Sequence, residues 1–194
     1  MNRTANIDRR TRETEIALTL NLDGSGRADI STGIGFLDHM LTSLALHASW
    51  DLNLKCQGDL EVDDHHTAED CALALGQALD EALGERVGIV RFGWALAPLD
   101  EALSRAAVDL VARPYGEVDL QLKRELLGTI ACENLSHFLR SFATAGRFCC
   151  HVDVLKGAND HHRAEAGFKS LALALRQALT PAAEGSVPST KGVL

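Results

Sequence analysis

The pattern of apolar and polar residues changes its period several times along the chain, and each change predicts a new element. Residues 15–22 (EIALTLNL) alternate polar and apolar side chains, which predicts a half-buried strand. The Asp-Gly-Ser-Gly sequence that follows is typical of a tight turn, so we expect a hairpin into a second strand at residues 27–31. Helical spacing then begins at residue 36, just after two glycines, and continues to residue 47.

The remaining elements follow the same alternation of strands with amphipathic helices. A mixed order of strands, hairpins and helices predicts an α+β fold, and the helices bury their apolar faces best when they are layered against sheets. The predicted strands cover residues 51–56, 91–97, 104–111, 117–122 and 147–155, and the predicted helices cover residues 66–83, 131–145 and 162–179.

The chain also repeats itself. The segment FLDHMLTSLA aligns with NLSHFLRSFA, which places His39 over His137, and DHHTAED aligns with DHHRAEA further along in each half. Two matching blocks in the same order indicate an internal duplication. No Pro- or Ser-rich linker separates the halves, so we predict a single domain over 1–194. It consists of two fused repeats (about 9–90 and 91–185) and a C-terminal substrate-binding tail (186–194).

Charge and hydropathy exclude several classes of partner. The formal net charge is −8, so no overall basic field attracts nucleic acid or anionic lipid. No apolar stretch approaches the roughly 20 residues that a membrane helix needs. The polar N-terminus lacks the apolar run of a secretory signal. We therefore expect a cytoplasmic protein without nucleic-acid or membrane partners.

The repeated His-His-x-x-Glu sequences are the strongest chemical signal. Residues three and four apart share one face of a helix, so His65, His66 and Glu69 can crowd one helix end. Imidazoles and a carboxylate at this spacing suit a transition metal such as manganese, iron, zinc or nickel. Solvated histidines would explain one such group but not two aligned groups. With the upstream histidines there are eight candidate ligands, which suit two ions: His39, His65, His66, Glu69, His137, His161, His162 and Glu165.

Four cationic residues near predicted strand ends and the tail form a second candidate set. Each alone is typical of a surface charge, but beside a metal pair the set would bind an anionic substrate, because Arg and Lys both recognise phosphate oxygens. These residues are Arg91, Arg113, Lys169 and Lys191.

Several long phrases resemble the imidazoleglycerol-phosphate dehydratase family of histidine biosynthesis. They are GIGFLDHML, DLEVDDHHTAEDCALALGQAL, PLDEALSRAAVDLVAR, ENLSHF, GANDHHRAEAGFKSLALAL and PSTKG, and the similarity extends from about residue 9 to residue 194. The resemblance implies an internally duplicated unit with four helices layered between two four-stranded β-sheets (ribosomal protein S5 domain 2-like). It also implies two Mn(II) ions per subunit, other divalent transition metals being possible, and a homo-oligomer that is a 24-mer of trimers.

The resemblance assigns roles residue by residue. It places the metal ligands on the same eight residues, and pseudo-symmetry suggests that one ion takes His39, His65, Glu69 and His162 while the other takes the remaining four. Ser43 stands where the family commonly has Gln, which argues against a Gln-like contact and leaves room for a water. The implied substrate contacts are Glu13, His47, Arg91, Arg113, Lys169, Ser189 and Lys191.

The implied reaction is the dehydration of D-erythro-imidazole glycerol phosphate to imidazole acetol phosphate, through an imidazolate bound by two manganese ions. Glu13, Glu69 and Glu165 are the candidate acids and bases. Two alternatives use the same ligands. A dinuclear metallohydrolase would activate a bound water, and a metal-storage shell would catalyse nothing. The cationic set argues against storage, which requires no clamp for an organic phosphate.

Overall fold

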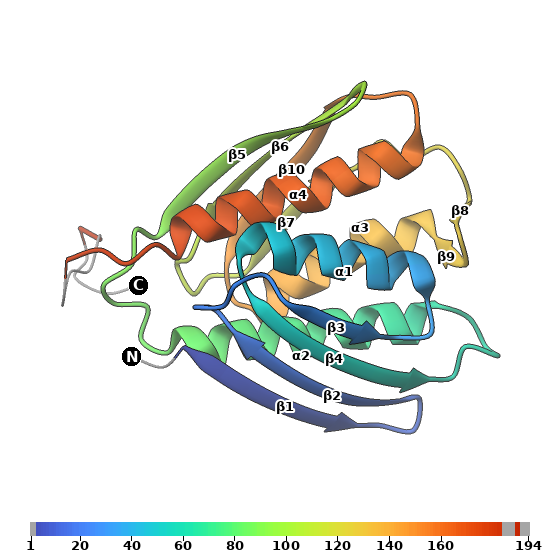
Figure 1. The fold of residues 1–194 in the computed structure, drawn as a ribbon, viewed down its shortest axis with the longest axis horizontal. Helices are drawn as coiled ribbons and strands as arrows, with labels where there is room; N and C mark the ends of the chain where they lie inside the picture. The colour runs from blue at the N-terminus through green and yellow to red at the C-terminus, as the bar shows by residue number, and fades with distance from the viewer. Residues whose placement is uncertain (1–2, 184–188, 191–194) are drawn as a thin grey trace.

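The chain forms two four-stranded sheets with four helices between them, as the resemblance implies (Figure 1). The computed structural model describes residues 3–183, 189 and 190. The first half comprises β1 (Thr4–Arg10), β2 (Thr14–Asn21), β3 (Ala28–Ser31), α1 (Gly35–Ala48), β4 (Asp51–Gly58) and α2 (His65–Leu83).

The second half repeats this order, with one addition. A small hairpin, formed by β8 and β9, precedes its first helix, and the sequence pattern gave no sign of it. The elements are β5 (Phe92–Leu99), β6 (Ala102–Asp109), β7 (Tyr115–Asp119), β8 (Leu126–Leu127), β9 (Ile130–Ala131), α3 (Cys132–Ala145), β10 (Cys149–Lys156) and α4 (Asp160–Ala178).

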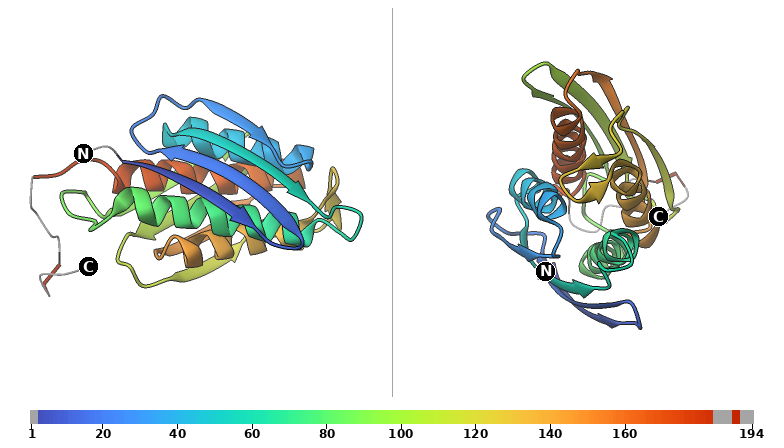
Figure 2. Two further views of the ribbon diagram at one scale, coloured as in Figure 1. Left: turned by 90° about the horizontal axis from the view of Figure 1, so that it is seen from below. Right: turned by 90° about the vertical axis from the view of Figure 1, so that its right-hand side faces the viewer.

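The two sheets have equivalent topology. Their strand orders are β1-β2-β4-β3 and β5-β6-β10-β7, and in each sheet the last strand pairs in parallel with its neighbour. All four helices start at the same end of the molecule, on the right in Figure 1, and Figure 2 shows the helix layer between the sheets. Strand and helix faces meet in one continuous core, in which Trp50, Phe138 and Phe168 are fully buried.

Two sequence predictions about the first sheet are wrong. The predicted hairpin between residues 15–22 and 27–31 does not form, because β1 and β4 occupy both edges of β2, and β3 pairs with β4 instead. Asp51 holds the predicted turn in place by accepting backbone N–H groups of Ser25 and Arg27. Strand β1 was also missed, because only Ala5 and Ile7 are its buried apolar residues.

A buried ion pair fixes the start of α4. Arg163 donates to Asp160 at 3.0 Å and to the carbonyl of Gln121 at 2.7 Å. The other oxygen of Asp160 accepts the backbone N–H groups of Lys123 (2.8 Å) and Arg124 (2.7 Å). Burial opposes ionisation of Asp160, but these N–H groups and Arg163 hold its pKa below the ordinary value. The network ties the irregular segment after β7 to the helix that carries His161 and His162.

Substituting Arg163 by Ala should therefore lower the free energy of unfolding by about 3 kcal/mol, because it leaves the Asp160 carboxylate buried without its cation. Denaturant titration at fixed protein concentration measures this change. Arg105 forms an exposed pair with Asp153, so Arg105→Ala is the matched control, with an expected cost of about 0.5 kcal/mol. Equal costs for the two variants would contradict the assigned role of the buried pair.

Among the described residues, no helix is both long enough and apolar enough to span a membrane.

Candidate active site

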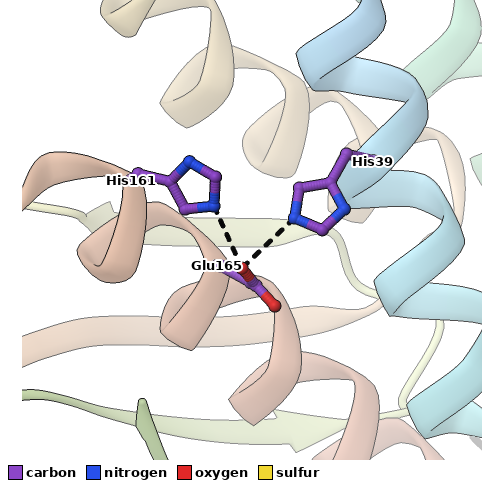
Figure 3. Close-up of side chains that lie close together, drawn as sticks. All are labelled: His39, His161 and Glu165. Carbon is purple, nitrogen blue, oxygen red and sulfur yellow. Dashed lines mark hydrogen bonds and ion pairs between the residues drawn. The ribbon is translucent and has the colours of Figure 1, made fainter. Parts of the chain in front are cut away.

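The first cluster of candidate ligands lies between α1 and α4. Glu165 Oε2 is 3.2 Å from His39 Nε2 and 3.3 Å from His161 Nε2 (Figure 3). The three ligand atoms lie within 4.8 Å of one another. Glu165 stands one helical turn after His161, so α4 supplies two of the three groups from one face. We call these residues the α1–α4 cluster.

A lysine lies directly beside the α1–α4 cluster. Lys169, one turn beyond Glu165, brings its Nζ atom 2.6 Å from Glu165 Oε1. Burial opposes ionisation of Glu165, but Lys169 and His39 outweigh it and hold its pKa below the ordinary value. Burial and the nearby Lys169 charge lower the pKa of His47, although Glu165 opposes this. Glu165, Lys169 and His47 therefore influence one another electrostatically beside the α1–α4 cluster.

The second cluster, the α2–α3 cluster, is the counterpart of the first in the other pair of helices. His137 Nε2 is 2.9 Å from Glu69 Oε1, and His65 Nε2 is 3.8 Å from Glu69 Oε2. The rings of His65 and His137 stack with centroids 5.0 Å apart. Asn134 contacts His65 Nδ1 at 3.0 Å and is itself held by Asp64.

Both clusters fit a divalent transition metal. Each brings two imidazole nitrogens and one carboxylate within 4.8 Å, which is the mixed nitrogen and oxygen donor set that manganese, iron and zinc accept. Three ligands per cluster leave coordination positions open for further groups.

The other two predicted ligands lie outside these clusters. His66 Nδ1 is 3.0 Å from Asp59, and His162 Nδ1 is 2.8 Å from Glu101. Hydrogen bonding to these carboxylates raises the pKa of both imidazoles. The backbone N–H of Asn159 and the contact with His162 lower the pKa of Glu101 to about 2.

The ligand partition expected from pseudo-symmetry does not form within one chain. It placed His39 with His65, Glu69 and His162, and it placed His66 with His137, His161 and Glu165. In the structure α1 pairs with α4 and α2 pairs with α3, so His39 faces Glu165 and His137 faces Glu69. The pairing of helices, which the repeat alone does not define, is the reason for the difference.

Several predicted substrate contacts lie far from both clusters. The backbone N–H of Arg91 donates to the carbonyl of Ala178, which at 1.5 Å per residue is about 25 Å along α4 from His161. Arg113 follows β6 on the same side, since Leu110 donates to the carbonyl of Arg91. Arg91 is buried and forms a bidentate pair with Asp109. One chain therefore does not bring these two cations to the histidines.

Three predicted contacts remain, together with Ser43, the position at which a Gln-like contact was not expected. Glu13, half-exposed before β2, has its carboxylate 3.7 Å from His66 Nε2. Ser189 lies in the segment after α4, and Lys191 lies outside the described residues. Ser43 is buried between His39 and His47 on α1, and its Oγ has no hydrogen-bond partner among the described residues.

Three residues that hold the histidines were missed by the sequence analysis. Asp59 and Glu101 contact imidazoles from loops, and Asn134 contacts His65 from α3. Asn134 stands three positions before His137 in ENLSHF, and this helical spacing was the only available signal.

The chain is similar to proteins of one family over most of its length. The family model described as imidazoleglycerol-phosphate dehydratase matches residues 32–175. A protein of that name from Candida glabrata is 54% identical over 206 residues, covering 97% of this chain and 98% of the relative. The one from Phytophthora nicotianae is 59% identical over 192 residues. The aligned region covers 99% of this chain but only 42% of that relative.

Solved structures lead to the same family. The imidazoleglycerol-phosphate dehydratase of Staphylococcus aureus superposes with a TM-score of 0.83 at 35% identity, covering 92% of this chain and 99% of that one. The enzyme of Pyrococcus furiosus, solved in complex with (S)-C348, superposes with a TM-score of 0.84 at 38% identity, covering 97% and 100%. The chain therefore belongs to the imidazoleglycerol-phosphate dehydratase family of hydro-lyases.

Proposed function

We propose that this protein dehydrates D-erythro-imidazole glycerol phosphate to imidazole acetol phosphate in L-histidine biosynthesis, in the cytoplasm. The observation that carries the proposal is the pair of duplicated clusters, each with two imidazoles and a carboxylate, at the starts of helices in a chain of this family. One cluster continues into Lys169 and His47, which suit the phosphate end of such a substrate.

Two Mn(II) ions per subunit, or other divalent transition metals, are the proposed cofactors. Bound ions would supply Lewis acidity to the two nitrogens of the substrate's imidazole ring, favouring its imidazolate form. Their proposed ligands are His39, His65, His66, Glu69, His137, His161, His162 and Glu165.

The protein's own groups must move protons. The reaction removes a proton from carbon and releases a hydroxyl group, so an acid and a base must flank the substrate. Glu13 is half-exposed on a turn beside His66, where its carboxylate is accessible to a substrate. Glu69 and Glu165 contact imidazoles within the clusters and are the other two candidates.

The distance of Arg91 and Arg113 from the histidines supports a homo-oligomer. If these cations bind the phosphate, a second copy must supply them, in agreement with a 24-mer of trimers. The outer face of the second sheet supports such assembly, because its edge strand β5 exposes apolar side chains where the equivalent strand β1 exposes polar ones. The exposed residues are Phe92, Trp94 and Leu96 on β5 and Asn6, Asp8 and Arg10 on β1.

The activity of the manganese-loaded protein tests the function directly. We expect dehydration of the imidazole substrate with Mn(II), a loss of at least about 100-fold after chelation, and recovery when Mn(II) is restored. Because ligand convergence and assembly are linked, light scattering should show a smaller species in chelator.

Each alternative predicts a different result in the same assay. A dinuclear hydrolase would release inorganic phosphate without forming the ketone, and a storage shell would bind Mn(II) without turnover. Either outcome would contradict the proposed function.

A further inference from the structure

Glu101 joins three parts of the molecule through one carboxylate. It lies in the turn between β5 and β6, and its Oε2 is 2.8 Å from His162 Nδ1. Its other oxygen accepts the backbone N–H groups of Ala158 at 3.0 Å and Asn159 at 2.8 Å, immediately before α4. The carboxylate therefore fixes both the start of the helix and the ring of His162.

In the first repeat, a carboxylate at a different position contacts Nδ1 of the equivalent histidine. There His66 Nδ1 contacts Asp59, the residue directly after β4. The equivalent position after β10 is Gly157, which has no side chain to offer. Its φ is +150°, and a Cβ atom there would lie 2.8 Å from Arg163 Cγ, within the buried pair that fixes α4. The second repeat cannot carry an aspartate at this position without strain.

Glu101 is itself the duplicate of Glu13. Each stands directly before the second strand of its sheet, Glu13 before β2 and Glu101 before β6. In the first repeat, Asp59 already occupies His66 Nδ1, and Glu13 lies instead 3.7 Å from His66 Nε2. The two hairpin carboxylates therefore have the same origin but face different nitrogens of their histidines.

We infer that Glu101 is a positioning residue that holds the Nδ1–H of His162 and directs Nε2 of that ring toward a metal ion. Asp59 does the same for His66. An imidazole that donates one N–H to a carboxylate has its tautomer and ring orientation fixed for coordination through the other nitrogen. Because Asp59 holds His66, Glu13 is the hairpin carboxylate that is available to the substrate. The inference rests on the metal site of the proposed function.

Glu101→Gln is the sharpest test, because the amide oxygen can still accept the N–H groups of Ala158 and Asn159. The amide group would then donate to His162 Nδ1 and force the proton onto Nε2, the nitrogen meant for the metal. Nitrogen NMR spectra of the histidine-labelled, metal-free protein should show this change of tautomer at His162. Competition with a chelator should show one of the two Mn(II) sites weakened about 10- to 100-fold.

Three further variants complete the design. Asp59→Asn should produce the same two changes at His66, and Asp119→Asn is the charge-matched control, since Asp119 is an exposed carboxylate of the same sheet that accepts the backbone N–H of Gln121. Should Glu101→Gln not fold, Glu101→Asp replaces it. The shorter side chain of Asp cannot contact His162 and the N–H groups before α4 at the same time.

The outcomes separate the inference from the proposed function. An unchanged His162 tautomer with wild-type Mn(II) binding in Glu101→Gln would overturn the inference. An equal loss of Mn(II) in Asp119→Asn would overturn it too, because the loss of a negative charge rather than the orientation of His162 would be responsible. A wild-type protein that binds Mn(II) with the expected tautomers but forms no ketone would contradict only the proposed function.

Discussion

Replacing Glu165 by glutamine is expected to lower kcat/KM about 1,000-fold or more. Glu165 Oε2 contacts both His39 and His161, while its Oε1 forms an ion pair with Lys169. A neutral amide keeps one oxygen and loses the charge, so it cannot hold a cation between the imidazoles and leaves Lys169 without its partner. Both proton movement and metal retention should therefore fail together.

Steady-state kinetics with saturating Mn(II), together with metal analysis, measure the two effects separately. Glu69→Gln, the duplicate position, should give a loss of similar size, because Glu69 contacts His137 in the same way. Glu81→Gln is the control, since Glu81 is an exposed residue of α2 whose carboxylate accepts an N–H of Gln77 rather than contacting either cluster. Retention of more than a tenth of wild-type kcat/KM in Glu165→Gln would contradict a role in the reaction.

The sequence predicted helices better than sheet pairing. Helical spacing of Ala and Leu extends over many residues, so all four helices lie within a few residues of their expected bounds. Strand pairing depends on contacts that the local pattern does not contain. The turn at Asp23–Gly26 looks like a hairpin, yet β2 pairs with β1, a strand whose short apolar face was too weak to detect.

The candidate ligands could be selected from the sequence because the repeat marks them twice. Their grouping within one chain could not be predicted, since it depends on which helices pair: α1 with α4 and α2 with α3. The residues proposed to orient the histidines could not be predicted from the sequence either. Asp59 and Glu101 are single acidic residues in turns, and Glu101 is far in sequence from the His162 that it contacts.

The duplication also shows how the two clusters have diverged. Lys169 lies one turn beyond Glu165, but Leu73 takes the matching place beyond Glu69. Likewise His47, on α1, corresponds to Ala145 at the end of α3. The α1–α4 cluster therefore has a lysine and a histidine at two positions where the α2–α3 cluster has apolar residues. This favours one orientation of the substrate, with the anionic end along α1 and α4.

Mixing two inactive variants is expected to restore activity, because the histidines and Arg113 of one chain cannot serve the same small substrate. A phosphorylated substrate of this size spans only about 10 Å, whereas Arg91, beside Arg113, lies about 25 Å along α4 from His161. Arg113→Glu reverses an exposed charge and should preserve the fold, and His161→Ala removes one ligand. Each variant alone should lose nearly all turnover.

Equal amounts of the two variants, dissociated in chelator and reassembled with Mn(II), should form sites that take Arg113 from one chain and His161 from another. If subunits mix at random, about a quarter of the sites receive both native residues, so kcat should recover to about a quarter of the wild-type value. Each variant taken through the same cycle by itself is the control and should remain inactive. If the mixture gains nothing while light scattering shows full reassembly, Arg113 and His161 do not act across a subunit boundary. The phosphate would then be bound by Lys169 and His47, which lie beside the α1–α4 cluster of the same chain.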